Sequence, residues 1–292
     1  MGSVVKLTGF LVLGLVTGIS NGQIQTEASN PLPAVASIAP DARLIVNQYI
    51  DATGGRKGWD QLKSLQGNGT ISMPLAGIAG DLSVIVTDDL YRRTMTLSGG
   101  PIKDASIQTG RNGDIVWQLT GDNGNFTGLL IEGAERARNL RQFQFNQLLD
   151  LDKNFSEVAM VDAQMIDGKN TLKLMMIPRS NPDSREYRYF DQGSHEIIRT
   201  EVEEPGRPLQ RTNFSNYRRF GPVKLHTQTD IMTSGQVLMR IAMPKMEVNQ
   251  SVPESVNEMP IEIRVLIGDE KVAAPASPAG APSEAPASES GS

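Results

Sequence analysis

The sequence predicts a mainly β protein with helices, an α+β fold built on one antiparallel sheet of about ten strands. Residues 223–243 form two runs in which apolar and polar side chains alternate, joined at Ser234-Gly235. This alternation is typical of strands with one covered face and one wet face. Similar short runs fill most of residues 67–222, and the connections between them are short. Short connections indicate antiparallel neighbours, because a parallel pair needs a long crossover.

The folded part is expected to begin with a helix. Pro40 suits the first turn of a helix, and the Asp41 carboxylate complements the helix dipole. Gly54 and Gly55 are expected to end this helix, since glycine is the common residue after a helix C-terminus. A second, shorter helical segment is expected at residues 58–65.

The strands are then expected to follow one another as hairpins. Asn112-Gly113 lies between the apolar runs 105–109 and 115–119, and Asn-Gly is the strongest short hairpin signal. In the second of these runs Ile115, Trp117 and Leu119 share a face. The remaining strands are expected at residues 67–73, 80–86, 90–97, 158–166, 171–177, 185–190, 196–202 and 208–218.

Residues 132–149 interrupt the strands and are predicted to be helical. They contain no Gly or Pro after Gly133 and are rich in Arg, Gln and Leu, which favour helices. The apolar residues are spread around the expected helix and do not form a narrow stripe. That distribution is expected of a helix contacted on several sides, or of one that lies over a ligand.

Residues 1–22 have the features of a secretory signal peptide. A single early positive charge, Lys6, precedes the apolar run 7–16, and small residues follow. Cleavage after Ser20 and cleavage after Gly22 both fit, and a retained N-terminal anchor is the alternative. The protein is therefore expected in the periplasm or outside the cell. No transmembrane domain is expected, because the apolar run is too short to span a bilayer.

The composition divides the rest of the chain into three parts. Residues 23–39 are expected to form a loose leader and residues 40–267 the folded domain. Residues 268–292 consist mostly of Ala, Pro, Ser, Gly and Glu. Such a segment cannot bury enough apolar surface to offset its ordering entropy, so it is expected to be a disordered tail.

Composition also excludes several functions. The chain has no cysteine, which excludes a disulfide framework and thiolate metal sites. Its net charge is −5, with no basic stretch interleaved with aromatics, so no nucleic-acid partner is expected. The two histidines, His195 and His226, are expected on the surface. No nucleophile with a positioned base and no metal motif is evident, so neither an enzyme nor a bound cofactor is expected.

The chain is poor in aromatics but contains 12 methionines, many of them on or beside the expected strands. Methionine is flexible and polarizable, and it suits surfaces that must fit variable apolar partners. Filling of an irregular core is the alternative use. The methionines therefore favour either an apolar binding surface or an ordinary core.

Several short segments occur along the chain in an order that is typical of a known protein family. They are residues 49–55 (YIDATGG), Trp59, 62–65 (LKSL), 67–70 (GNGT), 217–225 (YRRFGPVKL), 248–253 (VNQSVP) and 259–260 (MP). In these segments the chain resembles the bacterial outer-membrane lipoprotein-sorting proteins, the LolA/LolB-like family. The resemblance covers residues 40–260, essentially the whole expected domain.

The resemblance implies an incomplete antiparallel β-barrel, lidded by the N-terminal helix and the inserted helix, whose apolar concavity holds acyl chains. The lining of the cavity would then comprise Val223, Leu225, Ile231, Val237, Met239, Ile241, Met243 and Trp117. The lid would present Leu140, Phe143, Phe145 and Leu148. Candidates for the lid-locking arginine of the lipoprotein carriers, by location alone, are Arg136, Arg138 and Arg141.

We therefore expect a monomeric periplasmic or secreted protein that binds and carries a lipid or another acyl-bearing amphiphile without a covalent bond. A lipoprotein is one such molecule. The alternative is a protein-interaction or envelope-sensor module with the same fold and no carried ligand, whose partners would be lipoproteins or other envelope proteins. A tail rich in Ala, Pro and Ser would then serve as a tether or spacer.

Overall fold

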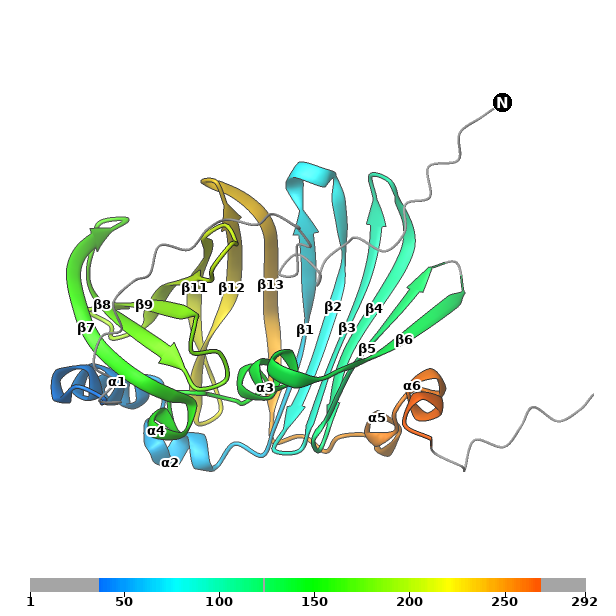
Figure 1. Ribbon diagram of the computed structural model, residues 1–292, viewed down its shortest axis with the longest axis horizontal. Helices are drawn as coiled ribbons and strands as arrows, with labels where there is room; N and C mark the ends of the chain where they lie inside the picture. Colours follow the sequence, from blue (N-terminus) through cyan, green and yellow to red (C-terminus); the bar gives the residue numbers. More distant parts are fainter. Residues whose placement is uncertain (1–36, 123, 269–292) are drawn as a thin grey trace, which may run out of the picture.

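The computed structural model describes residues 37–122 and 124–268. The expected signal peptide at 1–22 lies outside the described residues, as do most of the leader at 23–39 and nearly all of the tail at 268–292. The described chain is dominated by one antiparallel sheet of 13 strands, in the order β6-β5-β4-β3-β2-β1-β13-β12-β11-β10-β9-β8-β7. The sheet curls into an open half-barrel (Figure 1). The predicted fold class, an incomplete antiparallel barrel with helices, is confirmed.

Two meanders make up the sheet. The first comprises β1 (Ser64–Met73), β2 (Ile78–Thr87), β3 (Leu90–Gly99), β4 (Ile102–Asn112), β5 (Ile115–Asp122) and β6 (Asn125–Ile131). The second comprises β7 (Phe155–Ile166), β8 (Lys169–Pro178), β9 (Arg185–Asp191), β10 (Ile197–Glu203), β11 (Gln210–Phe220), β12 (Val223–Thr233) and β13 (Gln236–Val248). β13 pairs with β1 and joins the two meanders, while β6 and β7 remain as the two edges.

The strand count exceeds the expected number of about ten, and β6 is a strand that the sequence pattern did not indicate. β6 is an edge strand, and most of its residues are exposed. It therefore lacks the alternation of apolar and polar residues that a strand with one covered face acquires.

The helices are α1 (Pro40–Ala52), α2 (Gly55–Asp60), the 3-10 turn η2 (Pro74–Ala76), α3 (Gly133–Gln142), α4 (Leu151–Asn154), α5 (Glu254–Asn257) and α6 (Ile261–Leu266). α1 begins at the predicted residue. α2 begins at Gly55 and not at residue 58. Between them Gly54 adopts a φ of 133°, and a Cβ at this position would lie 2.5 Å from the Pro222 carbonyl oxygen. The close approach of the α1–α2 corner to the start of β12 therefore requires glycine.

The helix expected at residues 132–149 is wrong in extent, because α3 ends at Gln142. The following residues turn, and the Asn146 side chain accepts a hydrogen bond from the Leu148 amide, an arrangement that competes with helix formation. Phe143 packs into one apolar cluster and Leu148 into another. A continuous helix could not deliver both side chains to these two places.

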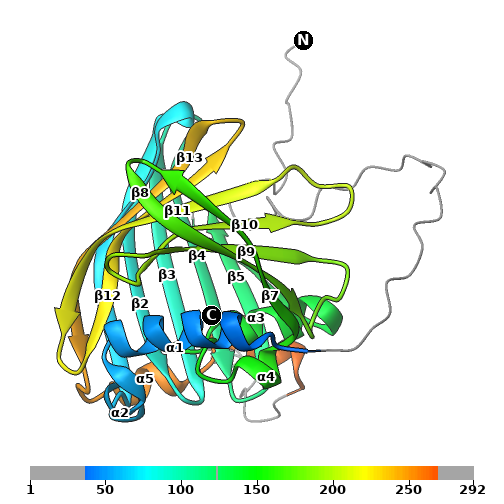
Figure 2. The same ribbon diagram turned by 90° about the vertical axis from the view of Figure 1, so that its left-hand side faces the viewer.

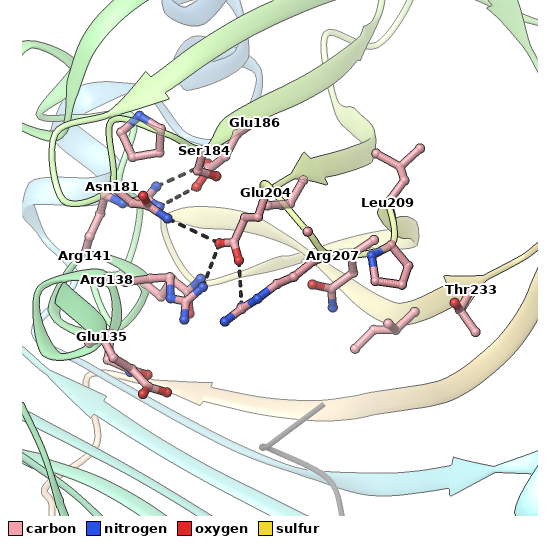
Figure 3. A pocket seen from close by; sticks show the side chains of 18 of the residues that line it. Glu135, Arg138, Arg141, Asn181, Ser184, Glu186, Glu204, Arg207, Leu209 and Thr233 are labelled. Carbon is pink, nitrogen blue, oxygen red and sulfur yellow. Dashed lines mark hydrogen bonds and ion pairs between the residues drawn. The ribbon is translucent and has the colours of Figure 1, made fainter. Parts of the chain in front are cut away.

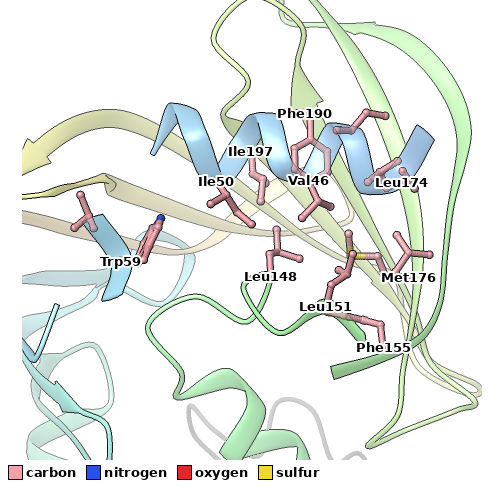
Figure 4. Close-up of a cluster of buried hydrophobic side chains, with 14 of the residues drawn as sticks. Val46, Ile50, Trp59, Leu148, Leu151, Phe155, Leu174, Met176, Phe190 and Ile197 are labelled. Carbon is pink, nitrogen blue, oxygen red and sulfur yellow. The ribbon is translucent and has the colours of Figure 1, made fainter. Parts of the chain in front are cut away.

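The main core lies between the helices and the β7–β12 part of the sheet (Figure 4). α1 supplies Val46 and Ile50 to this core, α2 supplies Trp59, and the segment after α3 supplies Leu148. Figure 2 shows α1 crossing one end of the curled sheet. This end of the half-barrel is therefore filled by side chains.

Candidate ligand cavity

The segment that connects β6 to β7 must cross the mouth of the half-barrel. These two strands follow one another in the sequence but form the opposite edges of the sheet. The connecting residues 132–154 contain α3 and α4, and Figure 1 shows α3 between the two halves of the sheet. The topology alone therefore puts a helix over the opening, as the family resemblance implied.

On the side of the first meander, α3 is held by aromatic stacking. The Phe143 ring stacks on the Tyr91 ring of β3, with 3.9 Å between the centroids. Phe143 is also clustered with Val116 of β5, and Leu140 of α3 packs against the same cluster. The face of the sheet that carries Val116 and Tyr91 is called the inner face below, and the opposite face the outer face.

On the side of the second meander, α3 is held by ion pairs. Arg138 lies 2.8 Å from the carboxylate of Glu204, which follows β10. Arg141 is buried and forms an ion pair and two hydrogen bonds with Glu186 of β9. Of the three arginines singled out by location, these two join the helix to the far half of the sheet. Arg136 instead donates a 2.6 Å hydrogen bond to the carbonyl of Asp114, next to β5.

Two adjacent cavities lie between this crossing segment and the second meander, with volumes of about 360 and about 430 Å³. Gln142, Glu186, Val202 and Gln210 line both cavities. The first cavity extends to Ile231, Met232 and Leu238 on β12 and β13, and part of its lining is drawn in Figure 3. The second adds several aromatic and polar side chains, namely Tyr49, Gln144, Phe145, Asn146, Gln147, Phe214, Tyr217 and His226.

Charged side chains gather where α3 meets the second meander. Glu204 accepts hydrogen bonds from Arg138 at 2.8 Å and from Arg207 at 2.6 Å (Figure 3). Glu186 accepts hydrogen bonds from Arg141 and, at 3.1 Å, from Arg188. Burial alone would raise the pKa of Glu186, but the two guanidinium groups lower it below its ordinary value. The Glu186 carboxylate therefore remains charged, and the ion pairs of both carboxylates attach the helix to the second meander.

The inner face beside these cavities is apolar. A cluster of buried side chains from β1 to β4 and β13 covers it: Ile71, Met73, Ile78, Leu82, Met95, Leu97, Ile107 and Met239. This cluster lies on the inner face because Met95 is four positions after Tyr91 on β3, so that both side chains point to the same side of the sheet. Ile231, Ile241 and Met243 pack against the cluster. We call these 11 residues, 8 in the cluster and 3 packed against it, the apolar wall.

The structure brings four of the expected lining residues together in this wall: Ile231, Met239, Ile241 and Met243. Val223 is fully buried in the main core below α1 and α2, and Leu225 packs against that core. Val237 pairs with Met232 beside an irregularity in the β12–β13 register, and its neighbour Leu238 lines the first cavity instead.

Trp117 lies on the outer face, so its expected place in the lining is corrected. It is fully buried in a cluster with Leu119 and with Ile263 of α6. Its neighbour Val116 is the β5 residue that contacts Phe143 at the end of α3. Adjacent residues of a strand point to opposite faces, and an alternating pattern does not state which face is the inner one.

The four expected lid residues divide between two clusters. Leu140 and Phe143 pack with Val116 at the first meander. Leu148 is buried in the main core and Phe145 packs against it, while Phe145 also lines the second cavity. The crossing segment therefore covers the cavities with its backbone and polar groups as well as with apolar side chains.

His226 was expected to face solvent, and this expectation is wrong. Its ring lies 4.5 Å from the Phe214 ring and 5.7 Å from the Tyr217 ring, between centroids, and it lines the second cavity. Burial lowers the pKa of His226 to about 4. Asn216 on the neighbouring strand has a φ of 57°, which departs from regular strand geometry, and its carbonyl accepts a hydrogen bond from the Thr227 hydroxyl. Strict alternation does not hold at this irregularity.

The charged residues of the site were not singled out from the sequence. Glu186 and Arg188 alternate with Tyr187 and Tyr189 in β9, so either pair could have been read as the covered one. The structure buries the charged pair against α3 and Phe155. The available signal was the presence of Arg138 and Arg141 on a segment already expected to be a lid, since arginines there need carboxylate partners if they are buried.

No family model and no curated protein sequence matches this chain. Solved structures do resemble it in fold. An outer membrane lipoprotein-sorting protein domain from Vibrio parahaemolyticus has 9% identity and a TM-score of 0.52, with 74% of this chain and 95% of that chain covered. A LolA superfamily protein from Nitrosomonas europaea has 12% identity and a TM-score of 0.50, with coverages of 75% and 97%.

A DUF1329 family protein from Desulfovibrio piger is similar to the same extent, with 8% identity, a TM-score of 0.53 and coverages of 74% and 97%. At these identities the likeness concerns the fold. The chain therefore has a LolA-like fold, an open antiparallel half-barrel crossed by a helix, as its resemblance to the lipoprotein-sorting proteins predicted.

Two further observations bear on the class of protein. Within residues 37–122 and 124–268, no helix is both long enough and apolar enough to cross a bilayer. Over the same residues, no three His, Cys, Asp or Glu side chains are arranged to hold a metal ion. The cavity lining that the structure describes consists mainly of apolar side chains, amides and arginine–carboxylate pairs, together with Tyr49, Tyr217 and His226.

Proposed function

We propose that this protein is an exported, non-covalent carrier of a lipid or another acyl-bearing amphiphile, of which a lipoprotein is one example. The observation that carries this proposal is the pair of adjacent cavities, about 360 and 430 Å³, between the crossing segment and the half-barrel. Their volumes are in the range of small-molecule sites. The partly buried members of the apolar wall, Ile231, Ile241 and Met243, would offer a surface for an acyl chain, with the buried members packed behind them.

Binding in such a site would be driven by apolar burial, at roughly 0.8 kcal/mol per methylene removed from water. Met243, the partly buried methionine of the wall, would adapt to chains of different length and saturation because its side chain is unbranched and flexible. The ion pairs of Arg138 and Arg141 would hold the crossing segment closed over the chain.

The test is to purify the exported form without detergent, extract it with organic solvent, and identify the extract by mass spectrometry. We expect about one lipid per protein molecule. A protein that yields no lipid and also fails to take up a fluorescent fatty acid would exclude the carrier function.

A second function, a protein-interaction or envelope-sensor module, is favoured by a different observation. Large apolar side chains are exposed where α6 lies against β6, among them Leu129, Ile261, Val265 and Leu266. Exposed apolar patches commonly mark contact sites. If the native protein carries no lipid, crosslinking in envelope extracts with and without the Val265→Ser, Leu266→Ser double substitution would test this function; loss of a specific crosslink is the expected result.

A further inference from the structure

Three buried charged side chains, Arg141 of α3 and Glu186 and Arg188 of β9, form a group where the helix contacts the sheet. The guanidinium groups of Arg141 and Arg188 both contact the carboxylate of Glu186, and each of the two arginines is only 5% exposed. Two positive charges and one negative charge leave the group with a net charge of +1. Uncompensated buried charge is costly, so its presence calls for an explanation.

The surrounding charges do not cancel this excess. The cavities are lined by four arginines, Arg138, Arg141, Arg188 and Arg207, and by three glutamates, Glu135, Glu186 and Glu204. Glu135 is exposed, and Glu204 already accepts from both Arg138 and Arg207. Glu196, near the second cavity, is paired with Lys224 at 2.5 Å. Each of Glu186 and Glu204 is therefore shared by two arginines, and the positive excess that is fully buried is that of Arg141 and Arg188 around Glu186.

The unused hydrogen-bonding capacity at this place consists of donors. The Nε–H groups of Arg141 and Arg188 are buried and have no partner among the described residues, and neither has the Nδ2 group of Asn146 in the second cavity. Three donors with no acceptor are matched by a ligand that supplies oxygen lone pairs. The Phe155 ring lies 5.2 Å from the Arg141 guanidinium and 5.4 Å from that of Arg188, and fixes both in place.

The apolar part of the cavities adjoins this group. Val202 lines both cavities beside Glu186, and the first cavity continues to Ile231 and Leu238 at the apolar wall. A molecule with an oxyanion at one end and a hydrocarbon chain at the other would match charge, donors and apolar surface together. Arginine suits this role because its planar guanidinium binds carboxylate and phosphate through paired hydrogen bonds.

We propose that Arg141 and Arg188, with the Asn146 amide, form a subsite for the anionic headgroup, a carboxylate or a phosphate, of the carried amphiphile. This inference rests on the proposed carrier function and makes it more specific: the cargo enters with a charged head directed to β9 and its chain along the apolar wall.

The test compares ligands that share one chain and differ in the head. Hexadecanoate, hexadecyl phosphate and hexadecanol are titrated into delipidated full-length protein by displacement of a fluorescent fatty alcohol probe. We expect the two anions to bind at least ten-fold more tightly than the alcohol, and their ratio to distinguish a carboxylate from a phosphate head. Equal affinity for all three would overturn the subsite and leave the carrier intact, whereas absence of binding by all three would overturn both.

Variants of the β9 arginine separate charge from packing. Arg188→Gln is expected to abolish the preference for anions while hexadecanol binds as in the wild type, and Arg188→Lys is expected to retain most of the preference. Arg240→Gln, which breaks the pair that the half-exposed Arg240 forms with Asp230, is the matched control and should change neither affinity. A preference that survives Arg188→Gln in a folded protein, or one that Arg240→Gln removes equally, would contradict the inference. If Arg188→Gln does not fold, the ligand series on the wild type still decides.

Discussion

At the scale of single residues, His226 illustrates how packing changes the chemistry of a side chain. Its place among polar residues on an alternating strand suggests a solvated imidazole with an ordinary pKa. In the structure it lies against Phe214 and Tyr217, and burial lowers the pKa of His226 to about 4. The neutral imidazole is therefore the form that the folded protein accommodates.

This shift predicts an acid-dependent loss of stability. Since the folded-state pKa lies below that of the unfolded chain, about 6.5, the unfolded state binds the proton more readily between these two values. The free energy of unfolding should therefore fall as the pH decreases from about 6.5 to about 4, by on the order of 1–3 kcal/mol from this residue. Urea unfolding at pH 7 and pH 4.5 measures the loss, and His226→Gln should show a correspondingly smaller difference. An equal loss in both proteins would contradict the assignment.

At the scale of elements, the crossing segment contains a short helix that is attached to the sheet at two places. Stacking of Phe143 on Tyr91 fixes it to the first meander, and ion pairs fix it to the second. Separated aromatic rings lose their contacts and expose apolar surface, whereas the charges of the partly exposed Arg138–Glu204 pair can be hydrated when the pair opens. Opening is therefore expected to start on the side of Glu204, and the buried Arg141–Glu186 pair resists it.

Removing one ion-pair partner should loosen α3. Glu204→Gln takes away the charge that holds Arg138 and Arg207, and we expect faster hydrogen–deuterium exchange in residues 133–142 and faster uptake of a fluorescent fatty acid, by about three- to ten-fold. Asp230→Asn, which breaks the Arg240 pair, is the control. Unchanged exchange in α3 after Glu204→Gln would show that the helix is held by other contacts.

The β13 strand allows a test of the apolar wall. Ile241 lies in the wall, while its neighbour Arg240 pairs with Ser72 and Asp230 on the opposite face. Ile241→Ser should weaken binding of an acyl chain about ten-fold, because it removes apolar contacts and introduces a hydroxyl. Arg240→Ser should leave the affinity unchanged. The measurement is the affinity of each variant for the fluorescent fatty acid, compared between variants of equal melting temperature. Equal affinities of the Ile241→Ser and Arg240→Ser variants would exclude Ile241 from the lining.

At the scale of the whole molecule, an open sheet with its edges at β6 and β7 needs the crossing segment to control access. Because the chain has no cysteine, a pair of introduced cysteines can be crosslinked selectively between α3 and the second meander. Cysteines at positions 138 and 204, joined by a bifunctional maleimide, should fix α3 to the second meander. We expect ligand uptake and release to slow by more than ten-fold, with ligand trapped when the protein is loaded before crosslinking.

The double-cysteine protein without crosslinker is the control for this experiment, and it should exchange ligand at least as fast as the wild type, because it lacks the Arg138–Glu204 pair. Fluorescent fatty acid exchange, followed by stopped flow, measures both. Unimpeded exchange in the crosslinked protein would mean that ligands enter elsewhere.

Most of the strands, the first helix and the antiparallel pairing of successive strands could be predicted from the sequence alone. The signals used were alternating apolar residues, turn residues such as Asn112-Gly113, and the helix start at Pro40. All of these depend on backbone preferences of residues close together in the chain. The order of hairpins then predicted an antiparallel sheet, and the composition of residues 132–149 predicted a helix between the strands, for which the family resemblance implied a lid. β6 was missed because most residues of this edge strand are exposed, so that its sequence shows no regular alternation of apolar and polar residues.

Long-range packing determines which face of each strand is the inner one and which residues each buried side chain contacts. Trp117 and Val116 are adjacent in one strand, yet α6 covers the first and α3 contacts the second. Glu186 and Arg188 became part of the site because residues 45 positions apart in the chain, Arg141 and Glu186, come together when the sheet curls. Alternation of apolar and polar residues indicates that the two faces of a strand differ in environment. Burial, charge pairing and the pKa of His226 depend on contacts between residues far apart in the chain, which a local pattern does not contain.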